Sequence, residues 1–212
     1  MNKYTKLIYN EDIYHDLKIL PLEIEGNNFC ENIKAFFTEI DIPIDPMIIE
    51  VGTWKGSSAI EMAKFFLNKN PTVFCVDTWN GSAFHFQNDF FNKQLKRKNG
   101  YPTIYYQFLS NIIHNNLQDN IIPIPLNSLD GSRFIKNHLK IQSDICYIDA
   151  CHEYDDVIKD LEMYYPLVKD GGIFFGDDYD TGWPGVVNAV NDFARSLSKE
   201  VYLIKSQWII LK

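Results

Sequence analysis

The sequence predicts an α/β protein with a doubly wound, mostly parallel β-sheet that ends in an antiparallel hairpin. From about residue 28 onward, short apolar runs alternate with segments whose apolar residues recur at helical spacing, a pattern typical of a parallel sheet covered on both faces. Acidic or glycine-containing turns follow several of these runs, where the strands of such a sheet would end. The last apolar segment, residues 201–211, favours two short strands joined by a tight turn near Ser206 and Gln207.

The expected elements follow one another in a regular order. We expect strands at residues 47–51, 73–77, 121–125, 144–149 and 173–176. Helices are expected at residues 28–40, 56–68, 103–117, 128–139, 153–168 and 185–197, with one more around residues 90–98. Either Ser57 or Ser58 is a suitable N-cap for the second of these helices. Glycine at positions 171 and 172 predicts the C-cap of the helix that precedes the fifth strand.

Length and composition indicate one ordinary globular domain, spanning residues 1–212. The chain is 46% hydrophobic and 23% charged, and no apolar run approaches the ~18 residues of a membrane-spanning helix. The formal net charge of −8 argues against a general affinity for nucleic acid. The four cysteines lack paired zinc spacing and indicate free thiols in a reducing compartment. We therefore expect a cytoplasmic protein with neither a membrane nor a nucleic acid as partner.

Three carboxylates follow two of the expected strands. Asp149 comes directly after the apolar run 145–148, and Asp177 and Asp178 follow the run that ends at Gly176. Because the carboxyl ends of parallel strands meet at the edge where open α/β sheets bind ligands, we expect these side chains to lie together. Such carboxylates repel one another unless a cation or protons lie among them, and oxygen ligands favour a hard cation. The sequence therefore predicts a Mg²⁺ site.

The turn after the first strand and the end of the second strand suggest a nucleoside-type ligand. Gly52 and Gly56 would let the backbone approach a ligand closely. The turn lacks the middle glycine of G-x-G-x-x-G, and Glu50 adds a negative charge; both features argue against a bound pyrophosphate and favour a cationic or zwitterionic ligand. Asp77 ends the second strand, where a carboxylate can accept the hydroxyls of a ribose.

The order of these motifs resembles that of class I S-adenosylmethionine-dependent methyltransferases. The resemblance covers about residues 45–195 and rests on Glu50-x-Gly52-x-x-x-Gly56, Val76-Asp77-Thr78-Trp79, Ile148-Asp149-Ala150-Cys151-His152-Glu153-Tyr154, Lys169-Asp170-Gly171-Gly172 and Gly176-Asp177-Asp178. More narrowly, the motifs are similar to those of metal-dependent O-methyltransferases related to macrocin and aminocoumarin sugar methyltransferases, with catechol O-methyltransferase a more distant relative. The fold that this resemblance implies is the Rossmann-like class I methyltransferase architecture.

The resemblance also implies a role for each matching position. The residues implied at the methionine end of the cofactor are Glu50, Gly52, Thr53, Gly56 and Ser57. Those implied at its adenosine end are Asp77 with Thr78 for the ribose, and Trp79, Asn127 and Ser128 for the adenine. Asp149 would border the cofactor and take part in catalysis, and it would bind Mg²⁺ together with Asp177 and Asp178. His152 stands where family members place a general base.

The reaction implied by the resemblance is Mg²⁺-dependent methyl transfer to a hydroxyl of a small molecule, expected to be a sugar or another polyol. A divalent cation would stabilise the alkoxide, and a histidine that titrates near neutrality could remove the proton. One alternative is a metal-dependent hydrolase of phosphate esters, which a carboxylate cluster would also serve. Another is a cofactor-binding module without turnover. A homo-oligomer is left open.

Two segments are candidates for covering the site. Residues 1–27 are expected to form an N-terminal lid or cap. Residues 78–102 are expected to be an insertion near the active site, and their aromatic residues favour either helix packing or a substrate cap, with Trp183 on the opposite wall. The basic run Lys93, Lys96, Arg97 and Lys98 is expected to be a solvated surface or to face an anionic part of the substrate.

Overall fold

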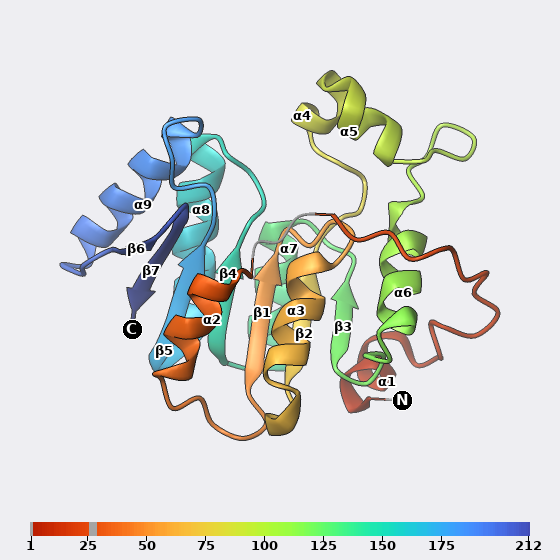
Figure 1. Ribbon diagram of the computed structural model, residues 1–212, viewed down its shortest axis with the longest axis horizontal. Coiled ribbons are helices and arrows are strands. Elements are labelled where there is room, and N and C mark those ends of the chain that lie inside the picture. The colour runs from red at the N-terminus through yellow and green to blue at the C-terminus, as the bar shows by residue number, and fades with distance from the viewer. Residues whose placement is uncertain (1, 26–28) are drawn as a thin grey trace.

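A mixed sheet organises the fold seen in the computed structural model, which describes residues 2–25 and 29–212. Seven strands of this described part form one sheet in the order β3-β2-β1-β4-β5-β7-β6 (Figure 1). The strands are β1 (Met47–Val51), β2 (Thr72–Val76), β3 (Ile121–Ile124), β4 (Ser143–Ile148), β5 (Val168–Gly176), β6 (Tyr202–Ile204) and β7 (Gln207–Leu211). Strands β1 to β5 pair in parallel, whereas β7 is antiparallel to both β5 and β6. This arrangement confirms the expected fold class.

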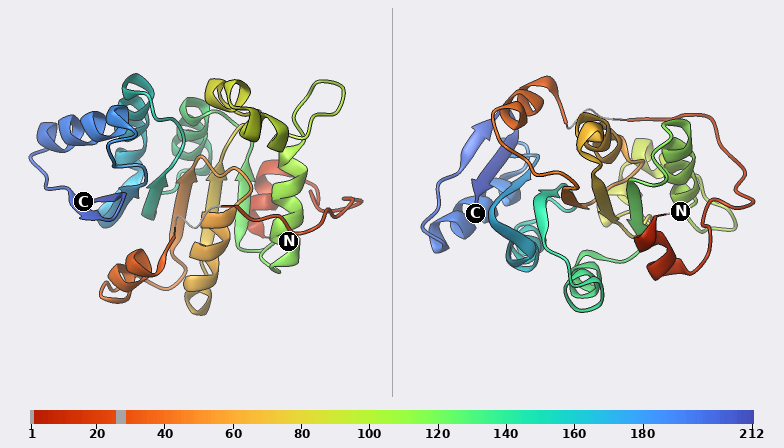
Figure 2. Two further views of the ribbon diagram at one scale, coloured as in Figure 1. Left: turned by 45° about the horizontal axis from the view of Figure 1, so that its top comes forward. Right: turned by 90° about the horizontal axis from the view of Figure 1, so that it is seen from below.

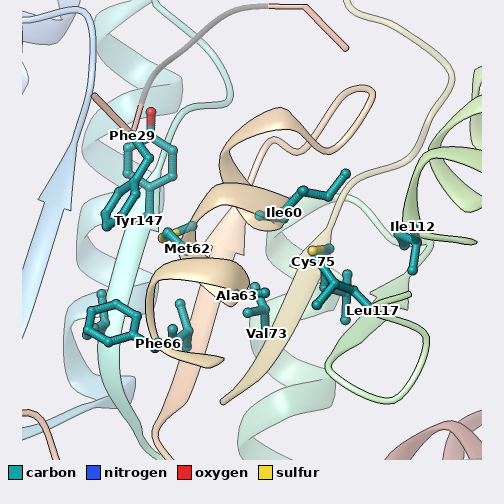
Figure 3. Close-up of a cluster of buried hydrophobic side chains, with 14 of the residues drawn as sticks. Phe29, Ile60, Met62, Ala63, Phe66, Val73, Cys75, Ile112, Leu117 and Tyr147 are labelled. Atoms are coloured by element: carbon teal, nitrogen blue, oxygen red, sulfur yellow. The ribbon is translucent and has the colours of Figure 1, made fainter. Parts of the chain in front are cut away.

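Helices cover both faces of the sheet because each presents an apolar stripe to it. One face packs against α2 (Glu31–Thr38), α3 (Ser57–Phe65) and α6 (Ile104–His114), and Figure 3 shows part of this core around Ile60, Phe66 and Val73. The other face packs against α7 (Ser128–Phe134), α8 (Tyr154–Tyr164) and α9 (Pro184–Ser196). The start expected for α2, at Asn28, lies outside the described residues. Helix α7 continues as a π-helical turn, Ile135–Leu139, so this helix reaches its expected end.

Both predicted helix caps are wrong. Gly56, at φ +88°, is the N-cap of α3, and Ser57 and Ser58 already lie inside the helix. The turn requires a positive φ at the residue before the helix, a conformation that glycine adopts without strain. Helix α8 ends at Tyr164 because Pro166 follows in a 3₁₀ turn and cannot supply the N–H that a continuing helix needs. Strand β5 then begins at Val168, so Gly171 lies within a strand and is not a C-cap.

The N-terminal segment, which we expected to be a lid or cap over the site, packs mainly against the edge strand β3 and helix α6. Helix α1 (Lys3–Tyr9) packs beside the edge strand β3, where the Tyr9 hydroxyl donates a hydrogen bond of 2.8 Å to the carbonyl of Pro123. The following residues run along α6, with hydrogen bonds from Leu20 N to Ser110 Oγ and from Asn111 Nδ2 to the Glu23 carbonyl (Figure 2). Most of the described part therefore covers the sheet edge and α6, and only its end reaches the site.

The expected insertion forms two short helices, α4 (Ala83–Gln87) and α5 (Asp89–Gln94), in place of one helix at 90–98. Figure 1 shows both beyond the carboxyl ends of the first three strands. Asn88 ends α4 and caps α5, because its side-chain oxygen accepts hydrogen bonds from the amides of Phe90 and Phe91. Asparagine capping thus divides the segment into two helices.

Candidate active site

The site lies where the strand order reverses, between β1 and β4. Val51 pairs with Ile148, so the turns that follow β1 and β4 are neighbours. A Cβ atom at Gly52 would lie 2.0 Å from the carbonyl oxygen of Asp149, so only glycine fits this close approach. A cavity of about 1020 Å³ opens here, at the upper end of the size range of small-molecule sites. Its wall includes the first turn, the insertion and the residues that follow β2, β3, β4 and β5.

Asp77 holds the first turn in shape. Its Oδ2 accepts hydrogen bonds from the backbone amides of Thr53 (2.9 Å) and Trp54 (2.8 Å), and its Oδ1 accepts one from the amide of Trp79 (2.7 Å). A carboxylate that accepts several amide hydrogen bonds fixes the local backbone firmly. Asp77 lines the cavity together with Thr78.

Glu50 lies beneath the turn and not at the cavity surface. It is fully buried, and its carboxyl accepts hydrogen bonds from the Ser58 hydroxyl and, at 3.6 Å, from the Cys75 thiol. Burial raises the pKa of Glu50 to about 8, so the group is largely protonated at neutral pH. Of the residues expected at the methionine end, Gly52, Thr53 and Ser57 line the cavity, whereas Glu50 and Gly56 do not.

The residues expected near the adenine are placed differently from one another. Asn127 and Ser128 line the cavity at the start of α7, where the Asn127 side chain caps the helix. Trp79 is buried in the core instead: its ring packs on Tyr105 and Phe108, and its indole N–H donates to the Trp54 carbonyl at 2.7 Å. Trp79 is absent from the described cavity wall, so it supports the first turn from behind.

A cluster of two carboxylates and one imidazole lies on the opposite side of the cavity. Asp149, His152 and Asp178 each offer a ligand atom, and these atoms lie within 4.8 Å of one another. The Nε2 atom of His152 lies 2.6 Å from Oδ2 of Asp178. Burial lowers the pKa of His152, but the hydrogen bond to Asp178 and the surrounding carboxylates outweigh burial and raise it above its usual value.

Asp177 is not one of the three described residues of this cluster, and its carboxyl has other partners. Its Oδ1 accepts a hydrogen bond from the Ser206 hydroxyl at 2.7 Å and another from the amide of Asp178 at 2.8 Å. Asp178 has a φ of +63°, so the chain bends sharply between the two carboxylates. We expected Asp177 as the third ligand beside Asp149 and Asp178. In the structure, the third member of the cluster is His152.

Aromatic rings line the mouth of the cavity and join its two sides. Trp183 stacks on His152 with ring centroids 4.0 Å apart, and Phe84 of α4 meets Trp183 edge-on at 5.7 Å. On the other side, Trp54 stacks on His85 at 4.5 Å. Sequence reasoning had noted Trp183 and the aromatic insertion, but it missed the pairing of Trp54 with His85, because nothing local indicates that residues 31 positions apart will stack.

Lys55 is a second residue that sequence reasoning missed. Its side chain is 1% exposed, and its ammonium donates hydrogen bonds to Glu23, to Glu25 (2.7 Å) and to Gln94 (2.7 Å). Glu25 also accepts a hydrogen bond from the indole of Trp54 at 3.2 Å. This ion network joins the N-terminal segment, the first turn and the insertion.

Most of the chain is similar to one known protein family. Residues 49–179 match a family described as "Methyltransferase domain". The chain belongs to this methyltransferase family. The matched range includes both glycines of the first turn, Asp77, and the Asp149, His152 and Asp178 cluster. The expectation of a methyltransferase, drawn from the order of the motifs, is therefore confirmed.

Solved structures confirm the expected architecture of this methyltransferase. It resembles the O-methyltransferase NovP with a TM-score of 0.61 and 16% identity, over 85% of this chain and 76% of that one. An O-methyltransferase from Bacillus cereus in complex with SAH gives a TM-score of 0.61 and 15% identity, over 92% and 84% of the two chains. CalS11, a TDP-rhamnose 3′-O-methyltransferase of calicheamicin biosynthesis, gives 0.56 and 14%, over 85% and 77%.

Sequence relatives add less about this methyltransferase. An uncharacterized protein, R132, of Acanthamoeba polyphaga mimivirus is 41% identical over 61 residues. This match spans 28% of this chain and 28% of that protein.

The four cysteines, all within the described residues, are free, in agreement with the expectation from their spacing. No described helix combines the length and the apolar character needed to cross a membrane.

Proposed function

We propose that this protein is an S-adenosylmethionine-dependent O-methyltransferase that uses a divalent cation, Mg²⁺ or a similar hard ion, to methylate a hydroxyl of a small molecule. One observation carries the proposal: the Asp149, His152 and Asp178 cluster shares a single cavity with the first turn of a methyltransferase fold. A methyl donor held at the turn would thus face an oxygen held at the cluster.

The residues at the first turn fit a nucleoside-type cofactor. Gly52, Thr53 and Ser57 of this turn line the cavity, where backbone and small side chains leave room for a ligand. Acidic residues outnumber lysines on the wall, which suits a ligand that carries a sulfonium and an ammonium. Gly52, Thr53 and Ser57 would hold the methionine part, and Asp77, Thr78, Asn127 and Ser128 would hold the adenosine.

The donor set of the cluster fits a cation. The ligand atoms of two carboxylates and an imidazole lie within 4.8 Å of one another, and the two carboxylates repel each other less when a cation lies between them. A divalent cation bound there would stabilise negative charge on the acceptor oxygen and fix the position of that oxygen. Asp149 and Asp178 would hold the cation. Asp177 would act indirectly: its carboxyl accepts a hydrogen bond from the amide of Asp178 and so helps to fix the backbone that positions the Asp178 side chain.

His152 is the proposed general base. In the neutral form of the ring, Nε2 of His152 donates to the carboxylate of Asp178, and Nδ1 then carries the lone pair. That nitrogen would take the proton of the acceptor hydroxyl as the oxygen attacks the methyl carbon. Trp183 holds the ring in place by stacking on it.

The proposed acceptor is a sugar or another polyol. Trp183 and Phe84 offer aromatic faces beside the cluster, and such faces suit the apolar side of a sugar ring. One solved structure with this fold is a TDP-rhamnose 3′-O-methyltransferase, which supports the same acceptor class. Two neighbouring hydroxyls of a diol could both approach the cation, which would also select the substrate.

A binding measurement and a turnover measurement test this proposal. Calorimetry should detect S-adenosylhomocysteine both with Mg²⁺ and with a chelator, whereas methyl transfer to a panel of sugars and diols should require the cation. Asp178→Asn should lose turnover while it retains affinity for S-adenosylhomocysteine. Asp155→Asn, at an exposed position in the first turn of α8, is the matched control and should behave as wild type. Full turnover of Asp178→Asn in chelator would rule out the cation site, and release of phosphate from esters without methyl transfer would favour a hydrolase.

A further inference from the structure

His85 is a cavity residue for which neither the family resemblance nor the proposed function provides a role. It belongs to α4 of the insertion and lines the cavity beside the first turn. Three features fix its ring: Trp54 stacks on it with an interplanar angle of 14°, Phe91 meets it edge-on with centroids 5.4 Å apart, and Ser82 binds its Nδ1 atom. A side chain held so firmly presents its remaining nitrogen in a defined direction.

The hydrogen bond to Ser82 determines where the proton of His85 lies. The backbone N–H of Ser82 approaches Nδ1 at 3.0 Å, and an amide can only donate, so Nδ1 must carry the lone pair. The Ser82 hydroxyl lies 2.8 Å from the same atom. Burial lowers the pKa of His85, which keeps the ring neutral near pH 7. The ring proton therefore lies on Nε2, and this N–H has no hydrogen-bond partner within residues 2–25 and 29–212.

Three donors near the first turn are already engaged. The amides of Thr53 and Trp54 both donate to Asp77. The ammonium of Lys55 donates to Glu23, Glu25 and Gln94 and is 1% exposed. A ligand carboxylate at this turn would thus meet neither these amides nor this cation, although the N-terminus of α3 faces the same cavity.

The charge of the cavity wall opposes the binding of such a group unless a local donor offsets the repulsion. Acidic residues outnumber lysines on the wall; they are Glu25, Asp77, Asp149, Asp156, Asp160, Glu162 and Asp178, against Lys55 and Lys159. An acidic wall attracts the cationic centres of S-adenosylmethionine but repels its carboxylate. A neutral N–H donor can bind that carboxylate without repelling the sulfonium.

We propose that Nε2–H of His85 binds the amino-acid carboxylate of the methyl donor, with Trp54 and Ser82 fixing the ring for this contact. The inference rests on the proposed function and assigns the carboxylate subsite to the insertion. A hydrogen bond from a preformed donor to an ionised carboxylate is worth about 10- to 100-fold in affinity.

Two ligands and two variants test the inference by calorimetry. S-adenosylhomocysteine carries the carboxylate, and its decarboxylated analogue keeps the amine and lacks only that group. Wild type should bind S-adenosylhomocysteine about 10- to 100-fold more tightly than the analogue. His85→Phe keeps an aromatic ring on Trp54 without the donor, so it should weaken S-adenosylhomocysteine by a similar factor and leave the analogue unchanged. His138→Phe, at an exposed histidine outside the cavity, is the matched control.

Nuclear magnetic resonance of the wild-type protein with ¹⁵N-labelled histidine gives a second readout that does not depend on a variant folding. The His85 ring should be the neutral Nε2–H form, and its Nε2–H signal should shift with S-adenosylhomocysteine but not with the analogue. The assignment would be overturned if His85→Phe weakened the binding of both ligands equally, or if the wild-type ring carried its proton on Nδ1. It would also be overturned if His85→Phe raised the KM of the acceptor and left the affinity for S-adenosylhomocysteine unchanged. Failure of wild type to bind either ligand would overturn the proposed function as well.

Discussion

The hydroxyl of Ser206 donates a hydrogen bond of 2.7 Å to Asp177, and this contact joins the C-terminal hairpin to the end of β5. Ser206 lies in the turn between β6 and β7, 29 positions from Asp177 along the chain. The same carboxyl oxygen accepts the amide hydrogen bond of Asp178. The hairpin therefore helps to set the bend that directs Asp178 toward His152.

Removing this hydroxyl should weaken the proposed cation site without destroying it. Ser206→Ala leaves Asp177 with one hydrogen bond fewer, a loss of about 1 kcal/mol, so the Mg²⁺ concentration for half-maximal activity should rise about fivefold. Ser196→Ala removes a hydroxyl at the end of α9 that bonds only a local carbonyl, and it should leave the Mg²⁺ requirement unchanged. A Mg²⁺ titration of turnover compares the two variants, and identical curves would mean that Asp177 does not depend on the hairpin.

Loss of the proposed base should separate chemistry from binding. His152→Ala removes the group that takes the acceptor proton, so kcat should fall about 10²- to 10⁴-fold. The dissociation constant of S-adenosylhomocysteine should change little, because the first turn would hold that ligand. Single-turnover kinetics and calorimetry provide the two measurements. Trp183→Phe, which keeps an aromatic ring against His152, should lose far less activity than His152→Ala.

The buried ion network should act as a unit. Lys55→Met leaves Glu23 and Glu25 without their shared partner, and since each is about 30% exposed, water offsets part of the loss. We expect a decrease of about 1–3 kcal/mol in the free energy of unfolding. Lys96→Met removes a partner of Glu23 that is 44% exposed and should decrease it by less than about 1 kcal/mol.

Denaturant unfolding of Lys55→Met, Glu25→Gln and the double variant would measure the coupling within this network. Because the two groups form one ion pair, the effect of the double variant should be smaller than the sum of the single effects. Strict additivity would show that Lys55 and Glu25 contribute independently.

Asp160 should make the stability depend on pH. This residue is 4% exposed on α8, and burial raises the pKa of its carboxyl above its usual range, to about 6. The folded state then binds more protons than the unfolded state between about pH 4 and 6, so the free energy of unfolding falls as pH rises through this window. Above pH 6 the buried charge destabilises the fold by up to about 3 kcal/mol.

Asp160→Asn removes the charge and keeps an oxygen acceptor, so it should raise Tm by several degrees at pH 7.5 and by almost nothing at pH 4. Asp155→Asn, exposed on the same helix, should give no such difference between the two pH values. Thermal unfolding followed by circular dichroism at both pH values is sufficient. An equal effect of Asp160→Asn at both values would contradict the expected titration.

The sheet and its helices were predictable because their signals are local. Met47–Val51 matches the predicted first strand at both ends, since five consecutive residues suited to a strand lie between a proline and a glycine turn. The helix caps were not predictable, because Gly56 precedes α3 in a conformation set by packing against Phe108 and the turn, whereas serine capping is only a statistical preference. The division of the insertion into α4 and α5 likewise depended on one asparagine side chain.

By itself, the sequence determined which residues end which strands, and so it predicted that Asp149, Asp177 and Asp178, with His152, would lie at one edge of the sheet. Strand direction and pairing order are sufficient for that step. Only the tertiary structure decided which side chains meet: Ser206 donates a hydrogen bond to Asp177, His152 contacts Asp178, and Trp54 stacks on His85. These contacts join residues that are far apart along the chain, and their geometry depends on turn conformations and on packing, which local sequence patterns do not specify.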